Sequence, residues 1–163
     1  MPIRWPSGGR PWRFLDAYEG TKAVPLFFDV LKRGGAVGGS SAGASIQAEY
    51  LVRGSPLGNF EMMCEGYERG LGFLPGAAVD PHFSQRPRFD DRTALMKRHP
   101  QRLGIGIDET TAIVVAGYVA EVMGRNKVHF DDYRKPPEKG KPDYTALTAG
   151  QRYGLKGRKV PEK

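Results

Sequence analysis

The segment Gly38–Gly43, with the sequence GGSSAG, constrains the fold of this chain more than any other feature. It contains a GxSxG pattern in which Gly39 and Gly43 flank Ser41. Glycines at these positions let two backbone segments approach closely where a strand turns sharply into a helix, and the turn exposes the serine hydroxyl. A glycine-rich turn that only packs or binds an anion has the same composition. Ser41 is therefore a candidate nucleophile whose assignment needs support from the rest of the chain.

The residues on both sides of this turn predict a strand, a turn and a helix in the required order. The side-chain-poor segment 34–37 suits a buried parallel strand, and the apolar residues of 44–52 have helical spacing. Upstream, 21–33 predicts a helix with Thr21 as a cap and Gly34 at its end. This series is half of a doubly wound α/β unit.

The rest of the chain alternates between strand and helix patterns up to residue 130. The expected elements are strands at 72–74, 77–79 and 103–108, a helix at 88–99, and antiparallel strands within 111–124 and 127–130. Beyond Asp131, prolines, glycines and charges predict an irregular basic arm. We therefore divide the chain into an α/β domain, 1–130, and a C-terminal arm, 131–163.

Few residues precede the first expected element of the fold. Gly8 and Gly9 have the pattern of a strand end, and little sequence precedes them. A doubly wound domain places its crevice among several parallel strands. We therefore expect the first strands of the domain to lie outside this chain.

The composition excludes several classes of protein. A chain of 163 residues is long enough for one domain with its own core, and a homodimer is common at this size. The single cysteine, Cys64, cannot form an internal disulfide and fits a reducing compartment. The sequence contains no apolar run of about 18 residues and no secretory leader, so we expect a cytoplasmic protein without a membrane partner. It also contains no His/Cys cluster for zinc, and we expect neither a metal nor an organic cofactor.

The formal net charge is +7, and much of the basic excess lies in residues 127–163. A basic segment can bind phosphate backbones, but this one contains no zinc finger, RRM or helix-turn-helix pattern. We therefore expect no nucleic-acid partner. A mildly basic surface favours small acidic substrates.

Several short motifs follow one another in an order and at spacings that are specific together. They are Gly8–Gly9 followed by Arg13–Asp16, Gly39–Ala44, Gly70–Phe73, Asp80–Phe83, Arg86 with Arg88, and Gly104–Glu109 before Thr111. Over residues 8–130 the chain resembles the cyanophycinase and aspartyl dipeptidase family of serine peptidases. The resemblance implies the fold of class I glutamine amidotransferase domains, which is a three-layer α/β domain with a mostly parallel sheet. It also implies a hydrolase of peptide bonds.

The resemblance makes Ser41 the nucleophile and His82 the general base. Chemistry requires such a pair, because a serine is a poor nucleophile until an imidazole, held in one tautomer by a carboxylate, accepts its proton. His82 follows an acidic residue at the end of an expected strand, where loops of α/β sheets carry active groups. His99 and His129 have the pattern of surface or packing residues.

The resemblance places the acid of the triad between the serine and the histidine. The carboxylates in that interval that could serve are Glu49, Glu61, Glu65 and Glu68. We expect Glu49 to lie on the helix after the turn, exposed to solvent. We favour Glu61 in the loop that follows, with Glu65 as the alternative. Asp80, Asp108 and Glu109 are assigned structural or substrate-positioning roles.

The oxyanion hole is expected to consist of backbone amides. One is that of Ala42, directly after the nucleophile, and the others belong to Gly9 and Arg10. Members of the family often have glutamine where this chain has Pro11 and Pro81. Proline has neither an amide hydrogen nor a side-chain donor, so we expect two polar contacts near the site to be missing.

The resemblance assigns substrate binding to Arg86 and Arg88, with Asp80 as a further positioning group. A guanidinium binds a carboxylate through two parallel hydrogen bonds, which suits a substrate that contains aspartate. Arg92 is a candidate third basic group, because Asp91 occupies the position where one is expected. Both an aspartate polymer bearing arginine and short aspartyl peptides stay open as substrates.

The sequence thus predicts a serine peptidase that hydrolyses an aspartate-containing peptide through an acyl-enzyme on Ser41. One alternative is a degenerate homologue that keeps the fold and serves as a binding module. Another is an esterase or amidase that uses the same turn on other substrates.

Overall fold

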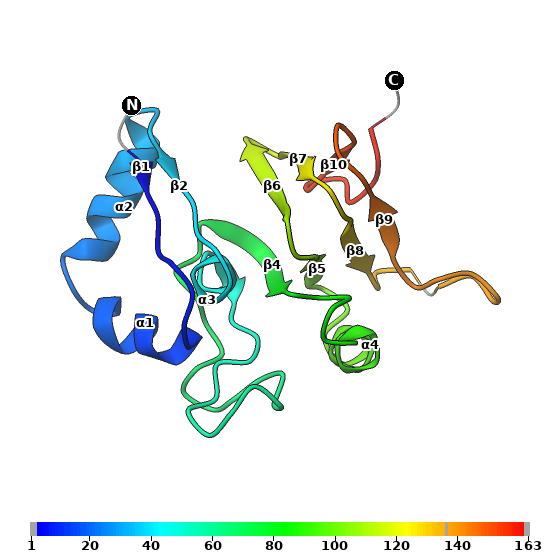
Figure 1. The fold of residues 1–163 in the computed structure, drawn as a ribbon, viewed down its shortest axis with the longest axis horizontal. Helices are drawn as coiled ribbons and strands as arrows, with labels where there is room; N and C mark the ends of the chain where they lie inside the picture. Colours follow the sequence, from blue (N-terminus) through cyan, green and yellow to red (C-terminus); the bar gives the residue numbers. More distant parts are fainter. Residues whose placement is uncertain (1–2, 136, 162–163) are drawn as a thin grey trace. The chain divides into compact units, whose positions relative to one another are not determined.

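The computed structural model describes residues 3–135 and 137–161. The chain divides into two compact units, Met1–Pro81 and His82–Lys163 (Figure 1). This boundary falls inside the segment 1–130 that composition groups into one domain.

The first unit combines short helices with pairs of parallel strands. Its elements are β1 (Ile3–Arg4), α1 (Pro11–Tyr18), α2 (Ala23–Lys32), β2 (Ala36–Val37), α3 (Ala42–Ser45), β3 (Ala48–Tyr50) and β4 (Leu74–Pro81). β1 pairs with β2, and β3 pairs with β4, both in parallel. Figure 1 shows α2 beside the β1–β2 pair. Leu15, Ile46 and Leu51 form a buried apolar cluster in this unit.

The helix expected at 44–52 is much shorter than its apolar spacing predicts. α3 ends at Ser45, and the chain is extended again from Ala48 to Tyr50. Leu51 donates its amide to the carbonyl of Glu68 (2.8 Å), and Gly70 donates to the carbonyl of Glu49 (2.9 Å). Because these partners come from a distant part of the chain, sequence periodicity alone could not predict the extended conformation.

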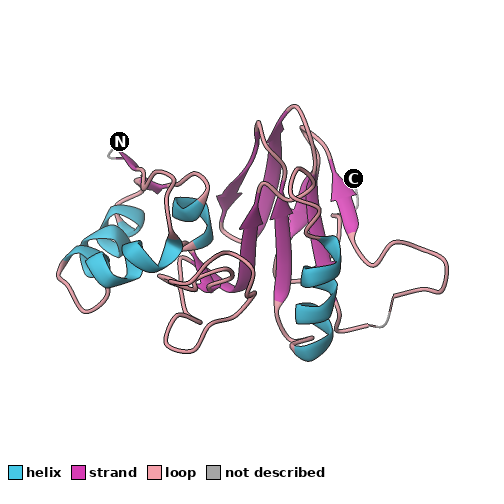
Figure 2. Cartoon of the chain, turned by 60° about the horizontal axis from the view of Figure 1, so that its bottom comes forward, coloured by secondary structure: helices cyan, strands magenta, loops and turns pink. Residues whose placement is uncertain are grey.

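The second unit contains one helix and two antiparallel sheets (Figure 2). Its elements are α4 (Phe89–Arg98), β5 (Leu103–Ile107), β6 (Thr111–Ala116), β7 (Val119–Gly124), β8 (Val128–Asp132), β9 (Thr145–Leu147) and β10 (Arg152–Gly154). One sheet has the order β5-β8-β9 and the other β6-β7-β10, all antiparallel. The expected hairpin is confirmed, and its turn contains Gly117 at a φ of 58°.

The segment 131–163 is more regular than its composition predicts. β9 pairs with β8, and β10 pairs with β7. Tyr153 on β10 is 2% exposed, and its ring stacks on that of Phe130 with the centroids 4.0 Å apart. An irregular arm is therefore the wrong description of these two short strands, which complete the sheets of the second unit.

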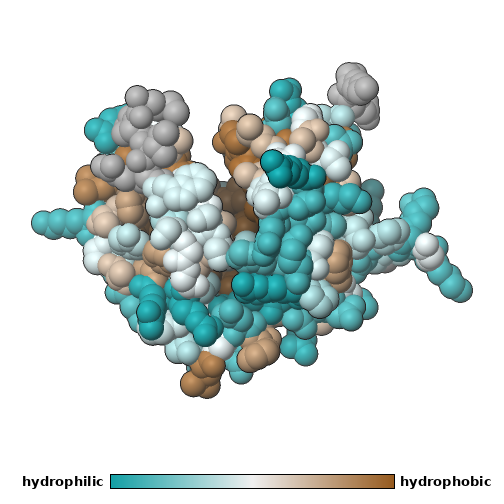
Figure 3. Space-filling view, in the orientation of Figure 1, coloured by the Kyte–Doolittle hydropathy of each residue, from teal (hydrophilic) through white to brown (hydrophobic). Residues whose placement is uncertain are grey.

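The α/β class is confirmed, with parallel strand pairs in the first unit and a separate antiparallel sheet in the second. Both units carry brown apolar groups on the face shown in Figure 3, within a mostly hydrophilic surface. The exposed large apolar residues include Leu57, Phe60, Tyr118 and Met123. Within the described ranges, none of the helices has the length and apolar character to cross a bilayer.

Candidate active site

Ser41 has the backbone conformation of a strained strand-to-helix turn. Its φ is 52° and its ψ is −121°, and α3 begins at the next residue. This region of backbone space is almost confined to glycine, so a serine in it stores strain of about 1 to 3 kcal/mol. Strain of this kind is typical of a nucleophile elbow, in which the turn holds the hydroxyl away from the sheet.

The flanking glycines are required by close backbone packing. A Cβ placed on Gly39 would lie 2.2 Å from the carbonyl oxygen of Gly43, and one placed on Gly43 would lie 2.1 Å from that of Pro6. The amide of Gly43 also donates to the carbonyl of Ser7 at 3.2 Å. The segment that contains Pro6 and Ser7 therefore packs directly against the turn, as the GxSxG pattern predicts.

The Gly8–Arg10 turn, which we expected to contribute to the oxyanion hole, lies next to Ser41. A Cβ placed on Gly8 would lie 3.4 Å from Cβ and 3.8 Å from Oγ of Ser41. Gly9 has a φ of 142°, and Arg10 is the N-cap of α1. Pro11 is the first residue of α1, where the missing N–H breaks no helical hydrogen bond. The first unit thus brings Ser41, the candidate nucleophile, and this backbone turn together.

The loop that carries Glu61 is anchored to the same turn. Arg10 donates from Nη1 to Oδ1 of Asn59 (2.8 Å), and Arg53 donates from Nη1 to the carbonyl of Asn59 (2.8 Å). Glu61 itself is exposed. Glu49 lies on β3, where its carboxylate accepts hydrogen bonds from Arg69 (3.0 Å) and from the amide of Gly76 (2.8 Å). Its role is therefore structural.

His82 is the first residue of the second unit, and its ring lies against a carboxylate of the same unit. Nδ1 of His82 is 2.9 Å from Oε1 of Glu109. An ionised carboxylate only accepts hydrogen bonds, so Nδ1 donates to Glu109, and in the Nδ1–H tautomer Nε2 is the acceptor nitrogen of the ring. This is the tautomer that a general base in a serine peptidase requires.

The carboxylate next to His82 is that of Glu109, and the assignment of Glu61 as the acid stays a prediction. Glu109 comes after His82 in the sequence, outside the interval in which the acid is expected. The signal for Glu109 was present, because it closes the GIGIDE motif just beyond β5. It lies outside the interval between Ser41 and His82 to which the resemblance assigns the acid.

Asp80 is held in a buried ion pair, and its role as a substrate-positioning group stays a prediction. Both carboxylate oxygens lie 3.1 Å from Nε of Arg53, and the side chains of Asp80 and Arg53 are 2% and 7% exposed. Breaking such a pair leaves an uncompensated buried charge. Asp80 therefore stabilises the end of β4 from inside the first unit.

The three arginines after His82 have different environments. Arg86 is exposed, whereas Arg88 is 6% and Arg92 is 2% exposed. Arg92 forms an ion pair with Asp131, and its guanidinium lies 3.5 Å from the ring centroid of Phe83. Burial does not support a substrate contact for Arg88 or Arg92, and Arg86 is the arginine of this group that faces solvent.

His129 has a packing environment. Its ring lies among Phe83, Phe89 and Tyr144, and desolvation by burial lowers its pKa. Nε2 of His129 is 3.4 Å from Oδ2 of Asp108. His99 is the C-cap of α4, and burial also lowers the pKa of its ring.

Comparison with known proteins identifies the family of this chain. The sequence model of Peptidase family S51 matches residues 7–123. The chain belongs to peptidase family S51. A cyanophycinase of Trichormus variabilis is 35% identical over 130 residues, which are 77% of this chain and 43% of that protein. A cyanophycinase of Synechococcus elongatus is 37% identical over 132 residues, or 78% of this chain and 41% of that protein.

The crystal structure of a peptidase from an acI-B1 Actinobacterium has the same fold as this S51 family member. It superposes with a TM-score of 0.69 at 25% identity, over 93% of this chain and 59% of that one. This chain spans about two fifths of the length of the two cyanophycinases. The resemblance to the cyanophycinase family is thus confirmed for this part of the protein.

Proposed function

We propose that this chain provides the nucleophile and the general base of a serine peptidase that cleaves aspartate-containing peptides. The observation that carries the proposal is the backbone of Ser41, held at a positive φ beside the Gly8–Arg10 turn. The pairing of His82 with Glu109 and the membership in family S51 support it independently.

In the proposed reaction, Oγ of Ser41 attacks the carbonyl carbon of the peptide while Nε2 of His82 accepts the hydroxyl proton. Glu109 orients the ring and stabilises the imidazolium. The amides of Ala42 and of Gly9 or Arg10 would stabilise the oxyanion. His82 then passes the proton to the leaving amine, and water, deprotonated by the same ring, releases the acyl group from the serine.

The proposed substrate class follows from Arg86 and from the relatives. An exposed guanidinium can bind the carboxylate of an aspartyl residue through two hydrogen bonds. The relatives described above are named cyanophycinases. We therefore propose β-aspartyl or N-terminal aspartyl peptides as substrates, and expect Arg86→Ala to raise KM for them more than it lowers kcat.

Labelling with a fluorophosphonate probe tests the nucleophile and the acid together. We expect Ser41 to be labelled in the folded chain and the label to be absent in Ser41→Ala. His82→Ala and Glu109→Gln should slow labelling by about 100-fold or more, because the hydroxyl is then not activated. Glu61→Gln is the matched control and should label at the wild-type rate. Equal labelling of wild type and Ser41→Ala would contradict the proposal.

The second candidate function is a binding module that keeps the fold without catalysis. Pro11 and Pro81 favour it, since they stand next to the Gly8–Arg10 turn and to His82 and donate no hydrogen bond. A folded wild-type chain that is not labelled, but binds aspartyl peptides in a manner that depends on Arg86, would favour this module over the enzyme.

A further inference from the structure

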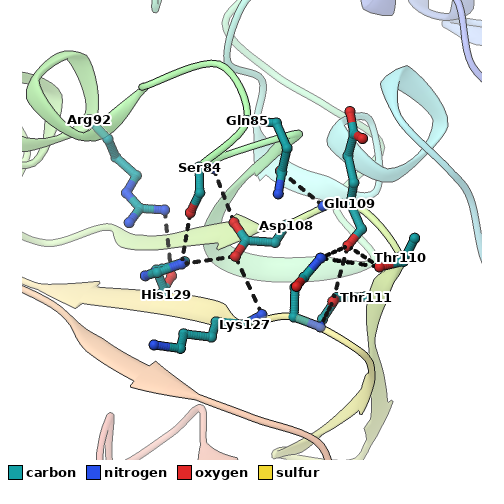
Figure 4. Close-up of polar contacts among 10 residues, drawn as sticks. Ser84, Gln85, Arg92, Asp108, Glu109, Thr110, Thr111, Lys127 and His129 are labelled. Carbon is teal, nitrogen blue, oxygen red and sulfur yellow. Dashed lines mark hydrogen bonds and ion pairs between the residues drawn. The ribbon is translucent and has the colours of Figure 1, made fainter.

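The stretch after His82 is fastened to the turn that contains Glu109 by two reciprocal hydrogen bonds. The amide of Ser84 donates to Oδ1 of Asp108 (3.0 Å), and the amide of Glu109 donates to Oε1 of Gln85 (3.0 Å) (Figure 4). Each side of this clamp thus offers one backbone amide and one side-chain oxygen. The clamp fixes the separation between the two short segments that carry His82 and Glu109.

A second side chain binds the carbonyl of Glu109. Nδ2 of Asn126, in the turn between β7 and β8, donates to this carbonyl at 2.9 Å and lies 3.2 Å from Oγ1 of Thr110. The amide of Asn126 donates to Oγ1 of Thr111 at 2.9 Å, which secures the asparagine itself. The two peptide groups of Glu109 are therefore bound by two amide side chains from different parts of the unit.

Glu109 needs this support because about half of its own side chain is exposed to solvent. The side chain is 51% exposed, and the next residue, Thr110, has a φ of 57°. A half-exposed carboxylate on a strained turn is held less firmly than a buried one. Its position relative to His82 then depends on how firmly the backbone is held, and a displacement of about 1 Å can cost about 100-fold in rate.

We propose that Gln85 and Asn126 are positioning residues that hold Glu109 at Nδ1 of His82. The inference rests on the proposed function, since it assigns these two side chains to the orientation of the general base. Neither residue has to touch the substrate, because both act through the backbone of Glu109.

The tautomer of His82, observed by ¹⁵N NMR in the intact chain, tests this role. We expect wild type to hold the hydrogen on Nδ1. Gln85→Met removes the hydrogen-bond acceptor and Asn126→Asp removes the donor, each at nearly constant side-chain size. Both variants should shift the His82 ring toward a mixture of tautomers. They should also slow labelling of Ser41 about tenfold or more. Gln85→Glu, which keeps an acceptor oxygen, should largely restore the wild-type tautomer. The matched control is Gln101→Ala, at an exposed glutamine outside the clamp.

Thermal unfolding separates positioning from stability. Gln85 and Asn126 are both exposed, so we expect the variants to unfold near the wild-type temperature. Variants that lower the unfolding temperature but keep the wild-type tautomer would overturn the inference, as would wild-type labelling in both. If Asn126→Asp does not fold, the result for Gln85→Met alone decides whether the positioning role holds. If wild type is not labelled while the tautomer still responds to Gln85→Met, the proposed reaction fails and the positioning role stands.

Discussion

At the scale of single residues, the candidate chemistry coincides with unusual backbone conformations. Ser41, His82 and Thr110, which adjoins Glu109, all have positive φ values of 52° to 57°. Positive φ is uncommon for residues other than glycine, and it persists only where the surroundings enforce it. In this chain, the enforcing contacts are the close packing around Gly43 in the first unit and the Gln85 and Asn126 hydrogen bonds in the second.

At position 41, glycine should therefore give a more stable chain than alanine, which reverses the usual order. Ser41→Gly and Ser41→Ala both lose the hydroxyl and differ only in the Cβ that suffers strain at this φ and ψ. Glycine is ordinarily the less stable choice by about 0.4 to 1 kcal/mol, because it gains more freedom in the unfolded chain. Here we expect Ser41→Gly to be the more stable variant by about 1 kcal/mol. Urea denaturation of both variants measures the difference, and the ordinary order would show that the turn is unstrained.

The sequence predicted part of the candidate site. The GxSxG pattern identifies Ser41 because its glycines are needed for local packing, and His82 stands out as the histidine at a strand end. The partner of His82 could not be chosen in this way. It depends on which loops the fold brings together, and the carboxylates between Ser41 and His82 look as suitable as Glu109 until the 2.9 Å contact is seen.

At the scale of elements, local patterns predicted α2, α4, β5 and the β6–β7 hairpin well. These elements have clear periodicity or a turn signal such as Gly117. β3, β9 and β10 were missed, because each has only three residues and is stabilised by strands far away in the sequence. Short strands of this kind carry almost no local signal.

The attachment of α4 to β8 should depend on pH. Arg92 on α4 forms a buried ion pair with Asp131 on β8, yet burial raises the pKa of Asp131 to about 7, with the nearby Asp143 acting in the same direction. The folded-state pKa lies above the unfolded value of about 3.9, so the folded chain holds the extra proton between these values. The contribution of this carboxyl to stability therefore falls as the pH rises from about 4 to 7.

Arg92→Met should be costly only where Asp131 is charged. Near pH 5 the folded carboxyl is neutral and needs no counter-ion, whereas at about pH 8.5 the variant leaves a buried charge unpaired and should lose about 3 kcal/mol. Urea denaturation at the two pH values measures this difference. Arg98→Met, at an exposed position of the same helix, is the control and should change stability little at either pH. A loss for Arg92→Met that does not vary with pH would mean that Asp131 is ionised throughout.

At the scale of the whole molecule, composition and contacts divide the chain differently. Composition changes near Asp131, where prolines and basic residues accumulate, but the boundary between the two compact units falls after Pro81 in the sequence. The reason is that β9 and β10 return to pair with β8 and β7. A segment of low hydrophobicity can still complete a sheet, because backbone hydrogen bonds and one well-placed ring such as Tyr153 are sufficient.

The C-terminal segment should therefore be essential for the stability of the second unit. A chain that ends at Asp132 loses β9, β10 and the Tyr153 ring, and leaves Phe130 and one edge each of β7 and β8 uncovered. Loss of one buried aromatic side chain alone costs about 3 to 5 kcal/mol, and the unpaired strand edges promote aggregation. We expect the truncated chain to lose amide protection in β7 and β8 on hydrogen exchange. A chain that ends at Lys159, which keeps both strands, should retain it. Equal protection in the two chains would restore the description of this segment as a dispensable arm.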